Sequence, residues 1–90
     1  MLKIKYHSQF KKDYKRIIKR GYNENLLSDI LEYLVNEKPL PAQYKDHPLI
    51  GDYKGYRECH ILNDWLLVYK IENETLTLIL FRTGTHSDLF

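Results

Sequence analysis

The fold is decided by residues 55–83, GYRECHILNDWLLVYKIENETLTLILFRT. Three runs in this stretch read as β-strands, and they cover residues 55–62, 65–71 and 76–83. Short polar segments at 63–64 and 72–75 separate the runs. Because consecutive strands joined by short turns pair antiparallel, the stretch predicts a three-stranded antiparallel meander.

Two amphipathic helices are expected before the meander. After a short alternating strand at 2–6, Ser8 is placed to cap the first helix, Gly21 interrupts it, and Asn23 opens the second. Apolar residues recur at helical spacing on one face of each helix, namely Phe10, Tyr14, Ile17 and Ile18, then Leu26, Leu27, Ile30, Leu31, Leu34 and Val35. Pro39 ends the second helix. The pair predicts an αα-hairpin.

The order of these elements predicts an α+β fold. A strand, two helices and a meander over residues 1–90 suit one domain, in which the helix pair packs on one face of the sheet. The opposite face is then free for function. Residues 39–55 show no sustained period and are expected to form an ordered loop that carries Lys45, Asp46 and His47.

Composition excludes several classes of protein. The hydrophobic and charged fractions, 43% and 29%, are those of an ordinary globular chain. No apolar run approaches the roughly 18 residues that span a bilayer, and the N-terminus lacks the apolar core of a signal peptide, so a cytoplasmic protein without membrane contact is expected. The single Cys59 builds neither a disulfide nor a paired-cysteine zinc site.

Charge is concentrated at the N-terminus. The first 20 residues carry eight cations and one anion, a balance of +7, whereas the rest of the chain has a balance of −5. Such a stretch indicates a surface for RNA, DNA or an acidic protein, because each neutralised phosphate releases counterions. A solvated helix face explains the same pattern equally well.

Titratable side chains gather in the C-terminal half. Alternation places Tyr56, Glu58 and His60 on one side of the first meander strand and Cys59 on the other. His47 and His86 belong to the neighbouring loop and the tail, so the three imidazoles are able to converge. A single histidine is more often an ordinary surface residue, and only the combination favours acid–base chemistry.

Metal and covalent catalysis fit the sequence poorly. There is no His-Glu-x-x-His helix, cysteine pair or nucleophile elbow, and Cys59 lies in mid-strand as a small buried residue would. Neither a metal nor another cofactor is therefore expected.

Histidines with Arg82 are suited to RNA cleavage, in which the ribose 2′-OH attacks and the enzyme supplies a base, an acid and a cation for the phosphate. Four aromatic side chains could stack on the bases of such a substrate, namely Trp65, Tyr53, Tyr56 and Phe90. For Trp65 the alternative is a core anchor at the start of a strand.

Residues 44–90 resemble a known family. YKDHPLIGDYKGYRECHILNDWLLVYKI followed by RTGTHSDLF is similar to the YafQ branch of the RelE superfamily of toxin mRNA interferases. The motifs that carry the resemblance are DHPL, YRECHI with DW, and RTGTHSDLF, in that order. The N-terminal half agrees only in its layout. The resemblance implies a RelE-like fold and a cytoplasmic bacterial toxin that cuts mRNA without a metal, generally in the ribosomal A site, and is controlled by a cognate antitoxin protein.

The resemblance also implies roles for individual residues. Those expected to take part in cleavage are His47, His60, Asp64, Arg82, His86 and Phe90, and those expected to bind the substrate are Lys45, Glu58 and Trp65. His86 is expected to be the general acid, with His60 and His47 as base or phosphate-orienting groups, and Arg82 to contact the scissile phosphate. The terminal carboxylate of Phe90 is expected near the site.

Two other functions stay open at this point. One is a toxin of the same fold that grips a protein target such as DNA gyrase without cutting RNA. The other is an inactive regulatory protein. The histidine set favours the enzyme, because a pure binder has no need of clustered acid–base groups beside an arginine.

Overall fold

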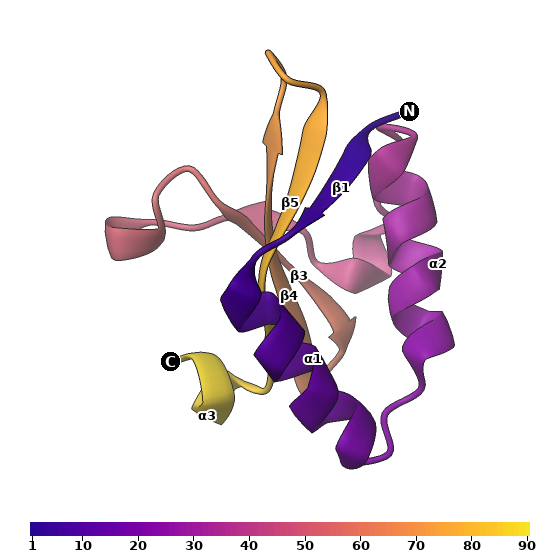
Figure 1. Ribbon diagram of the computed structural model, residues 1–90, viewed down its shortest axis with the longest axis vertical. Coiled ribbons are helices and arrows are strands. Elements are labelled where there is room, and N and C mark those ends of the chain that lie inside the picture. The colour runs from indigo at the N-terminus through magenta and orange to yellow at the C-terminus, as the bar shows by residue number, and fades with distance from the viewer.

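The computed structural model describes all 90 residues and is built around one five-stranded sheet. Its strands are β1 (Lys3–Tyr6), β2 (His47–Pro48), β3 (Arg57–Leu62), β4 (Trp65–Glu72) and β5 (Thr77–Gly84). Their order across the sheet is β1-β5-β4-β3-β2, and Figure 1 shows β1 next to β5 at one edge. β1 runs parallel to β5, and the other pairs are antiparallel. The predicted meander is confirmed as β3, β4 and β5.

The segment expected to be a loop contains more structure than its sequence predicts. Short 3₁₀ turns occupy Ala42–Tyr44 and Gly51–Tyr53, and between them β2 pairs with β3 so that His47 lies opposite Glu58. A strand of two residues is too short to leave an alternating pattern in the sequence, which is why the prediction missed it.

The two predicted helices are present with small corrections. They are α1 (Ser8–Lys19) and α2 (Glu24–Val35), and Asn23 caps α2 as expected. The prediction that Ser8 caps α1 is wrong by one residue, because the His7 side chain accepts the Gln9 N–H and Ser8 is already helical. A third helix that was not predicted, α3 (His86–Leu89), follows β5 and is too short for periodicity to reveal.

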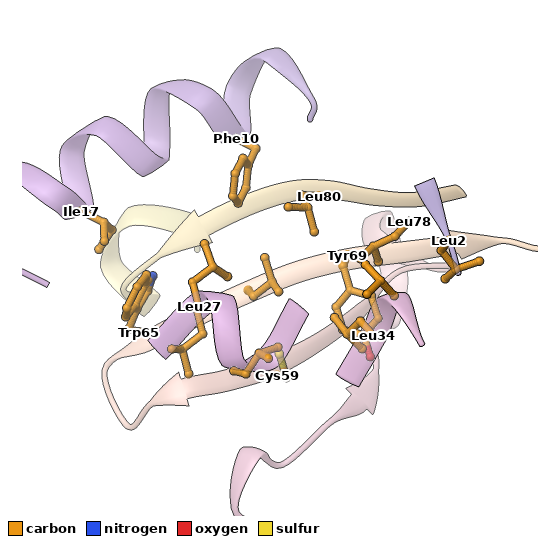
Figure 2. Packing of buried hydrophobic residues seen from close by; sticks show 14 residues of the cluster. Leu2, Phe10, Ile17, Leu27, Leu34, Cys59, Trp65, Tyr69, Leu78 and Leu80 are labelled. Carbon is orange, nitrogen blue, oxygen red and sulfur yellow. The ribbon is translucent and has the colours of Figure 1, made fainter. Parts of the chain in front are cut away.

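Helices α1 and α2 cover one face of the sheet, and in Figure 1 α1 crosses in front of the strands while α2 stands to their right. Figure 2 shows how side chains from both helices and from three strands meet in the core between these layers. Its members are Leu2, Phe10, Ile17, Leu27, Ile30, Leu34, Val35, Cys59, Ile61, Trp65, Leu67, Tyr69, Leu78 and Leu80. Burial of this apolar surface is the main source of stability of the fold.

The opposite face of the sheet carries only a thin apolar cover. Leu66, Val68 and Leu89 form a small buried cluster there, and Leu49, Tyr56 and Phe81 pack against it half-buried. No helix of the chain has the length and apolar character needed to cross a membrane.

Candidate active site

The sheet register lines up polar side chains on the face that α1 and α2 leave open. One row across the strands consists of His47, Glu58, Val68 and Arg82, and the next of His60, Leu66 and Gly84. Neighbouring strands lie about 4.8 Å apart, so residues in one row are close in space although they are distant in sequence. The chain then places His86 directly beyond the Gly84 end of the second row.

A β-bulge decides which way Arg82 points. Leu80 lies in the core opposite Tyr69, and strict alternation along β5 would turn Arg82 to that same side. The register shifts between Val68 and Tyr69, so that Arg82 instead lies opposite Val68 on the open face. Bulges commonly re-aim side chains in this manner near functional sites.

Three imidazoles form a continuous series on the open face, and we call His47, His60 and His86 the histidine row. The ring centroids of His47 and His60 are 6.3 Å apart, and those of His60 and His86 are 6.1 Å apart. The rings come from β2, β3 and α3, so no local motif holds them together. The convergence expected from the sequence is therefore found.

Glu58 lies beneath two members of the histidine row. Its side chain is only 5% exposed, and its Oε1 is 3.5 Å from Nε2 of His47 and 3.9 Å from Nε2 of His60. The other ring nitrogen of His47, Nδ1, is 2.7 Å from the Lys45 carbonyl oxygen. A carbonyl only accepts, so Nδ1 of His47 carries a hydrogen and donates it. An imidazolium at His47 or His60 would face a buried carboxylate.

Lys45 contributes to this site through its backbone. Its φ of 50° is in the left-handed region, and this turn brings its carbonyl oxygen to the His47 ring. The Lys45 side chain is exposed and makes no ion pair, so its predicted role in substrate binding stays a prediction.

An aromatic group adjoins the histidine row. The Phe90 ring lies 6.2 Å from the His86 ring and 5.4 Å from that of Tyr53, while Phe81 stacks on Tyr56 at 4.6 Å. Phe90 is 60% exposed, which leaves a large part of its face open to solvent. Exposed aromatic faces are platforms on which nucleic-acid bases stack.

Arg82 is held by a residue that the sequence did not single out as functional. Its Nε donates to Oδ2 of Asp13 at 2.7 Å and its Nη2 donates to Oδ1 at 3.2 Å. Asp13 is fully buried and also accepts from the Thr83 N–H and from the Gln9 side chain. The Asp13 carboxylate raises the pKa of Arg82, so the guanidinium stays charged. Its Nη1 does not bind Asp13, and the Tyr53 hydroxyl also lies beside the guanidinium.

A signal for Asp13 is present in the sequence. It is the single acidic residue among the first 20, and it falls on the apolar face of α1 with Phe10 and Ile17. A charge on the buried face of a helix needs a partner of opposite charge, and Arg82 is that partner.

Trp65 does not lie on the open face, and its predicted part in substrate binding stays a prediction. The residue is 0% exposed and belongs to the helix-side core (Figure 2). Its Nε1 donates to the Thr83 hydroxyl at 2.8 Å, and its ring meets Tyr22 edge-on. The alternative of a core anchor is the one that the structure supports, because a side chain without exposed surface cannot stack on a base.

Asp64 is separate from the histidine row. It lies in the exposed turn between β3 and β4, where its Oδ2 accepts from the Tyr22 hydroxyl at 2.7 Å. No ion pair joins Asp64 to a histidine. Its predicted part in cleavage would have to act through the turn that positions β3 and β4. Cys59 is buried in β3, as the sequence predicted, and burial raises the pKa of its thiol, which disfavours a nucleophilic thiolate.

The geometry suits proton transfer to and from a bound phosphodiester. Two imidazoles with centroids 6.1 Å apart leave room for a group that hydrogen-bonds to both, since each bond spans about 3 Å. No group of three or more His, Cys, Asp or Glu side chains is arranged to hold a metal ion. The chemistry available on this face is acid–base catalysis with a cation nearby.

Comparison with known proteins decides the family. A model of the family described as "Bacterial toxin of type II toxin-antitoxin system, YafQ" matches residues 2–90. The chain belongs to the YafQ toxin family. The resemblance of residues 44–90 thus extends along nearly the whole chain, and the N-terminal half, which agreed only in layout, is part of the match.

Relatives of this YafQ-family chain are similar in sequence and in structure. The mRNA interferase toxin YafQ of Escherichia coli K12 is 47% identical over 88 residues, which are 97% of this chain and 94% of that protein. A metal-bound toxin from Helicobacter pylori superposes with a TM-score of 0.94 at 47% identity, with both chains fully covered. YafQ in the E. coli DinJ-YafQ complex superposes with a TM-score of 0.90 at 45% identity and covers 100% of this chain and 99% of its own. The predicted α+β, RelE-like fold is confirmed.

Proposed function

We propose that this YafQ-family toxin is an endoribonuclease that cleaves mRNA through acid–base catalysis by the histidine row, without a metal. Family membership and the mRNA interferase activity named for the E. coli relative support the reaction class. The observation that carries the mechanism is the spacing of the histidine row above a buried carboxylate.

The catalytic steps follow from the positions of the three imidazoles. His60, between the other two rings, or His47 accepts the proton of the ribose 2′-OH as that oxygen attacks phosphorus. His86 donates a proton to the 5′ oxygen that leaves. Glu58 stabilises the imidazolium formed on the base, since its carboxylate lies within 4 Å of both candidate rings. The expected products carry a 2′,3′-cyclic phosphate and a 5′-hydroxyl.

Arg82 and Phe90 bind the substrate in this proposal. The Nη1 of Arg82, which Asp13 does not bind, neutralises the charge that grows on the phosphate, and the buried Asp13 keeps the guanidinium aimed at the open face. Phe90 and Tyr53 offer faces on which a base beside the cleaved bond stacks. Selectivity for RNA follows from the need for a 2′-OH.

The basic face of α1 supplies the long-range attraction. Its cations are all exposed, and they are Lys11, Lys12, Lys15, Arg16 and Lys19. We propose that this face approaches ribosomal RNA when the toxin cuts mRNA in the A site, and that a cognate antitoxin with an acidic segment competes for it. The E. coli complex of YafQ with DinJ supports an antitoxin partner. An mRNA substrate places the activity in the cytoplasm.

The decisive experiment measures cleavage of a defined mRNA by purified protein, with and without translating ribosomes, and maps the ends of the products. Wild type, His86→Ala and the matched control Ser87→Ala, at an exposed neighbour in α3, are compared in the presence and absence of EDTA. Wild type and Ser87→Ala should cut equally and leave cyclic phosphate ends. His86→Ala should be at least about 100-fold slower, as loss of a general acid requires.

The control arms separate the alternatives. Cleavage that EDTA abolishes would overturn the metal-free mechanism, and cleavage by His86→Ala at the wild-type rate would remove His86 from it. A folded wild type that cuts no mRNA in either setting but blocks supercoiling by DNA gyrase would replace the enzyme with the protein-binding toxin of the same fold. Cleavage only with ribosomes would support action in the A site.

Arg82→Ala adds a test of the substrate contact. It should slow cleavage strongly while binding to the antitoxin changes less, because the proposed contact is with the phosphate. Equal cleavage rates of wild type and Arg82→Ala would remove Arg82 from the mechanism. Since the change also leaves buried Asp13 without its partner, the folded fraction must be measured in parallel.

A further inference from the structure

The position of His86 depends on a helix that is too short to be stable by itself. Helix α3 spans four residues, His86–Leu89, and an isolated helix of that length does not persist in water. Beyond β5 the chain has left the sheet, so no strand pairing orients it. Other contacts must therefore decide where the imidazole of His86 and the ring of Phe90 lie.

One carboxylate makes most of these contacts. Oδ2 of Asp88 accepts from Nη1 of Arg20 at 2.7 Å, and its Oδ1 accepts from Nη2 at 3.1 Å, so the arginine binds it bidentately. Arg16, one turn earlier on α1, has its Nη1 3.6 Å from the same Oδ1. These contacts tie α3, at the lower left of Figure 1, to the C-terminal end of α1.

The same carboxylate closes the first turn of α3. Oδ2 of Asp88 accepts the Thr85 N–H at 2.9 Å, and the Asp88 N–H donates to the Thr85 hydroxyl at 3.2 Å, which together form a capping box. Arg20 and the Thr85 N–H hold the pKa of Asp88 well below its usual range, so the group stays ionised at neutral pH. The carboxylate of Asp88 thus takes part both in the capping box of α3 and in the ion pair with Arg20.

The strand end is shaped to receive Asp88. A Cβ at Gly84 would lie 2.9 Å from Cβ and from Oδ2 of Asp88, closer than side-chain atoms normally approach. Only a residue without a Cβ allows the carboxylate to lie over the end of β5. On the underside of α3, Leu89 is buried against Leu66 and Val68, which fixes the height of the helix above the sheet but not its rotation.

We propose that Arg20 and Asp88, assisted by Arg16, form a positioning clamp that holds His86 opposite His60 and thereby sets the geometry for proton transfer. This inference rests on the proposed ribonuclease function. The Asp88 side chain is 12% exposed and that of Arg20 is 41% exposed, and a pair of this kind adds little to overall stability. Its effect is on the placement of the imidazole, and small displacements of a catalytic group slow a reaction strongly.

Arg20→Ala is compared with Lys38→Ala, a control that separates the position of His86 from the loss of a charge. Each variant removes one exposed cation, and Lys38, which follows α2, makes no ion pair. Arg20→Ala should lower kcat about tenfold with KM within about twofold of wild type, because the substrate still binds but meets a misplaced acid. Lys38→Ala should leave kcat and KM unchanged. Arg20→Lys, which keeps the charge and loses the bidentate contact, should recover part of kcat.

Asp88→Asn closes a double-mutant cycle. The amide oxygen is able to keep the cap on the Thr85 N–H, whereas the amide nitrogen meets the arginine as a second donor. In the Arg20→Ala/Asp88→Asn double variant the loss of kcat should be no larger than in the worse single variant, since one contact is removed twice. Losses that multiply would mean that the two residues act independently, which would overturn the clamp.

NMR of the imidazoles gives a readout that does not depend on cleavage. In wild type, protons of the His60 and His86 rings, whose centroids are 6.1 Å apart, should show a mutual NOE that weakens in Arg20→Ala and persists in Lys38→Ala. If Arg20→Ala and Lys38→Ala match in both kcat and NOE while wild type cleaves RNA, the clamp is wrong and the proposed function stands. If wild type does not cleave RNA at all, the proposed function fails. A weaker NOE between His60 and His86 in Arg20→Ala would then describe the position of His86 but not a role in catalysis.

Discussion

The two faces of the sheet differ in what their side chains do. On the helix-covered face, apolar residues from α1, α2 and the strands pack into a core from which water is excluded. On the open face a thin apolar cluster supports the histidine row, a buried carboxylate and exposed aromatic rings. Residues that alternate along one strand therefore face either the core or the candidate site. In β3, Glu58 and His60 face the candidate site, and Cys59 and Ile61 face the core.

This division makes stability and activity separable by mutation. Changes on the helix side should unfold the protein without touching the chemistry, and changes on the open side should stop the chemistry in a folded protein. Asp13 and Asp88 are exceptions, because Asp13 of α1 binds Arg82 on the open face and Asp88 of α3 binds Arg20 at the end of α1. They are the places where the separation should break down.

The largest expected effect is on the open face. His60→Ala should slow RNA cleavage by about 10²–10⁴-fold, the contribution typical of a general acid or base, and should change the free energy of unfolding by less than about 1 kcal/mol. The adjacent Ile61→Ala is the control, since it points into the core and should lose about 2–5 kcal/mol of stability while its folded fraction still cuts RNA. Single-turnover cleavage and urea unfolding of both variants measure the contrast, and a His60→Ala protein that cuts normally would contradict it.

Trp65→Ala tests the opposite face. It removes a fully buried ring and its bond to the Thr83 hydroxyl, and it should lower the free energy of unfolding by about 3–5 kcal/mol. Urea unfolding followed by circular dichroism gives the value. Trp65→Phe, which retains most of the packing, should lose less stability and keep its cleavage rate. A strong loss of cleavage in a stable Trp65→Phe protein would show that the indole reaches RNA after all.

Asp13→Asn should affect both properties. Removal of the buried charge leaves Arg82 without its ion pair, which costs about 2–3 kcal/mol for charged hydrogen bonds of this kind, and releases the guanidinium from its position. Cleavage by the folded protein should fall as well. Glu72→Gln breaks the exposed pair of Lys70 and Glu72, and as a control it should cost under about 0.5 kcal/mol. Equal unfolding midpoints for the two variants would refute the structural role of Asp13.

The smallest effect concerns Asp88 and depends on pH. Arg20, Arg16 and Thr85 surround this carboxylate, and its pKa in the folded protein is lowered below the ordinary value of 3.8. A depressed pKa contributes stability above the ordinary value, and that contribution disappears as the pH falls through the folded value. Wild type should therefore exceed Asp88→Asn in unfolding free energy at pH 7, and the difference should shrink below about pH 4.

Urea unfolding at pH 7 and pH 3 checks this behaviour. Ser87→Ala, which removes no titratable group from α3, should differ from wild type by the same amount at both values. A difference between wild type and Asp88→Asn that grows on acidification would have the wrong sign for a depressed pKa.

Much of the site was visible in the sequence because local patterns express it. Alternation in β3 placed Glu58 and His60 together, and the helix stripes identified the core side of α1 and α2. His47 and His86 were visible only as histidines of the C-terminal half that no local period connects to His60, and the motif resemblance then assigned roles to them. It also selected Trp65, for which burial in the core was the better of the two open interpretations.

The parts that the sequence did not predict depend on contacts between distant residues. Asp13 and Arg82 are 69 positions apart, and Arg20 and Asp88 are 68 positions apart. Ion pairs across such separations leave no spacing that a reader of the sequence can recognise. β2 and α3 were missed for another reason, since two and four residues are too few to show a period.

The sequence by itself determined the class of fold, the layer arrangement and the face on which we propose the chemistry, because hydrophobic periodicity acts residue by residue. Only the tertiary structure decided how the site is assembled. Alternation alone would have turned Arg82 into the core, and the bulge opposite Val68 and Tyr69 turned it to the open face. The histidine row likewise exists only when β2, β3 and α3 are brought together, because its geometry is set by strand register and by the contact of Arg20 with Asp88.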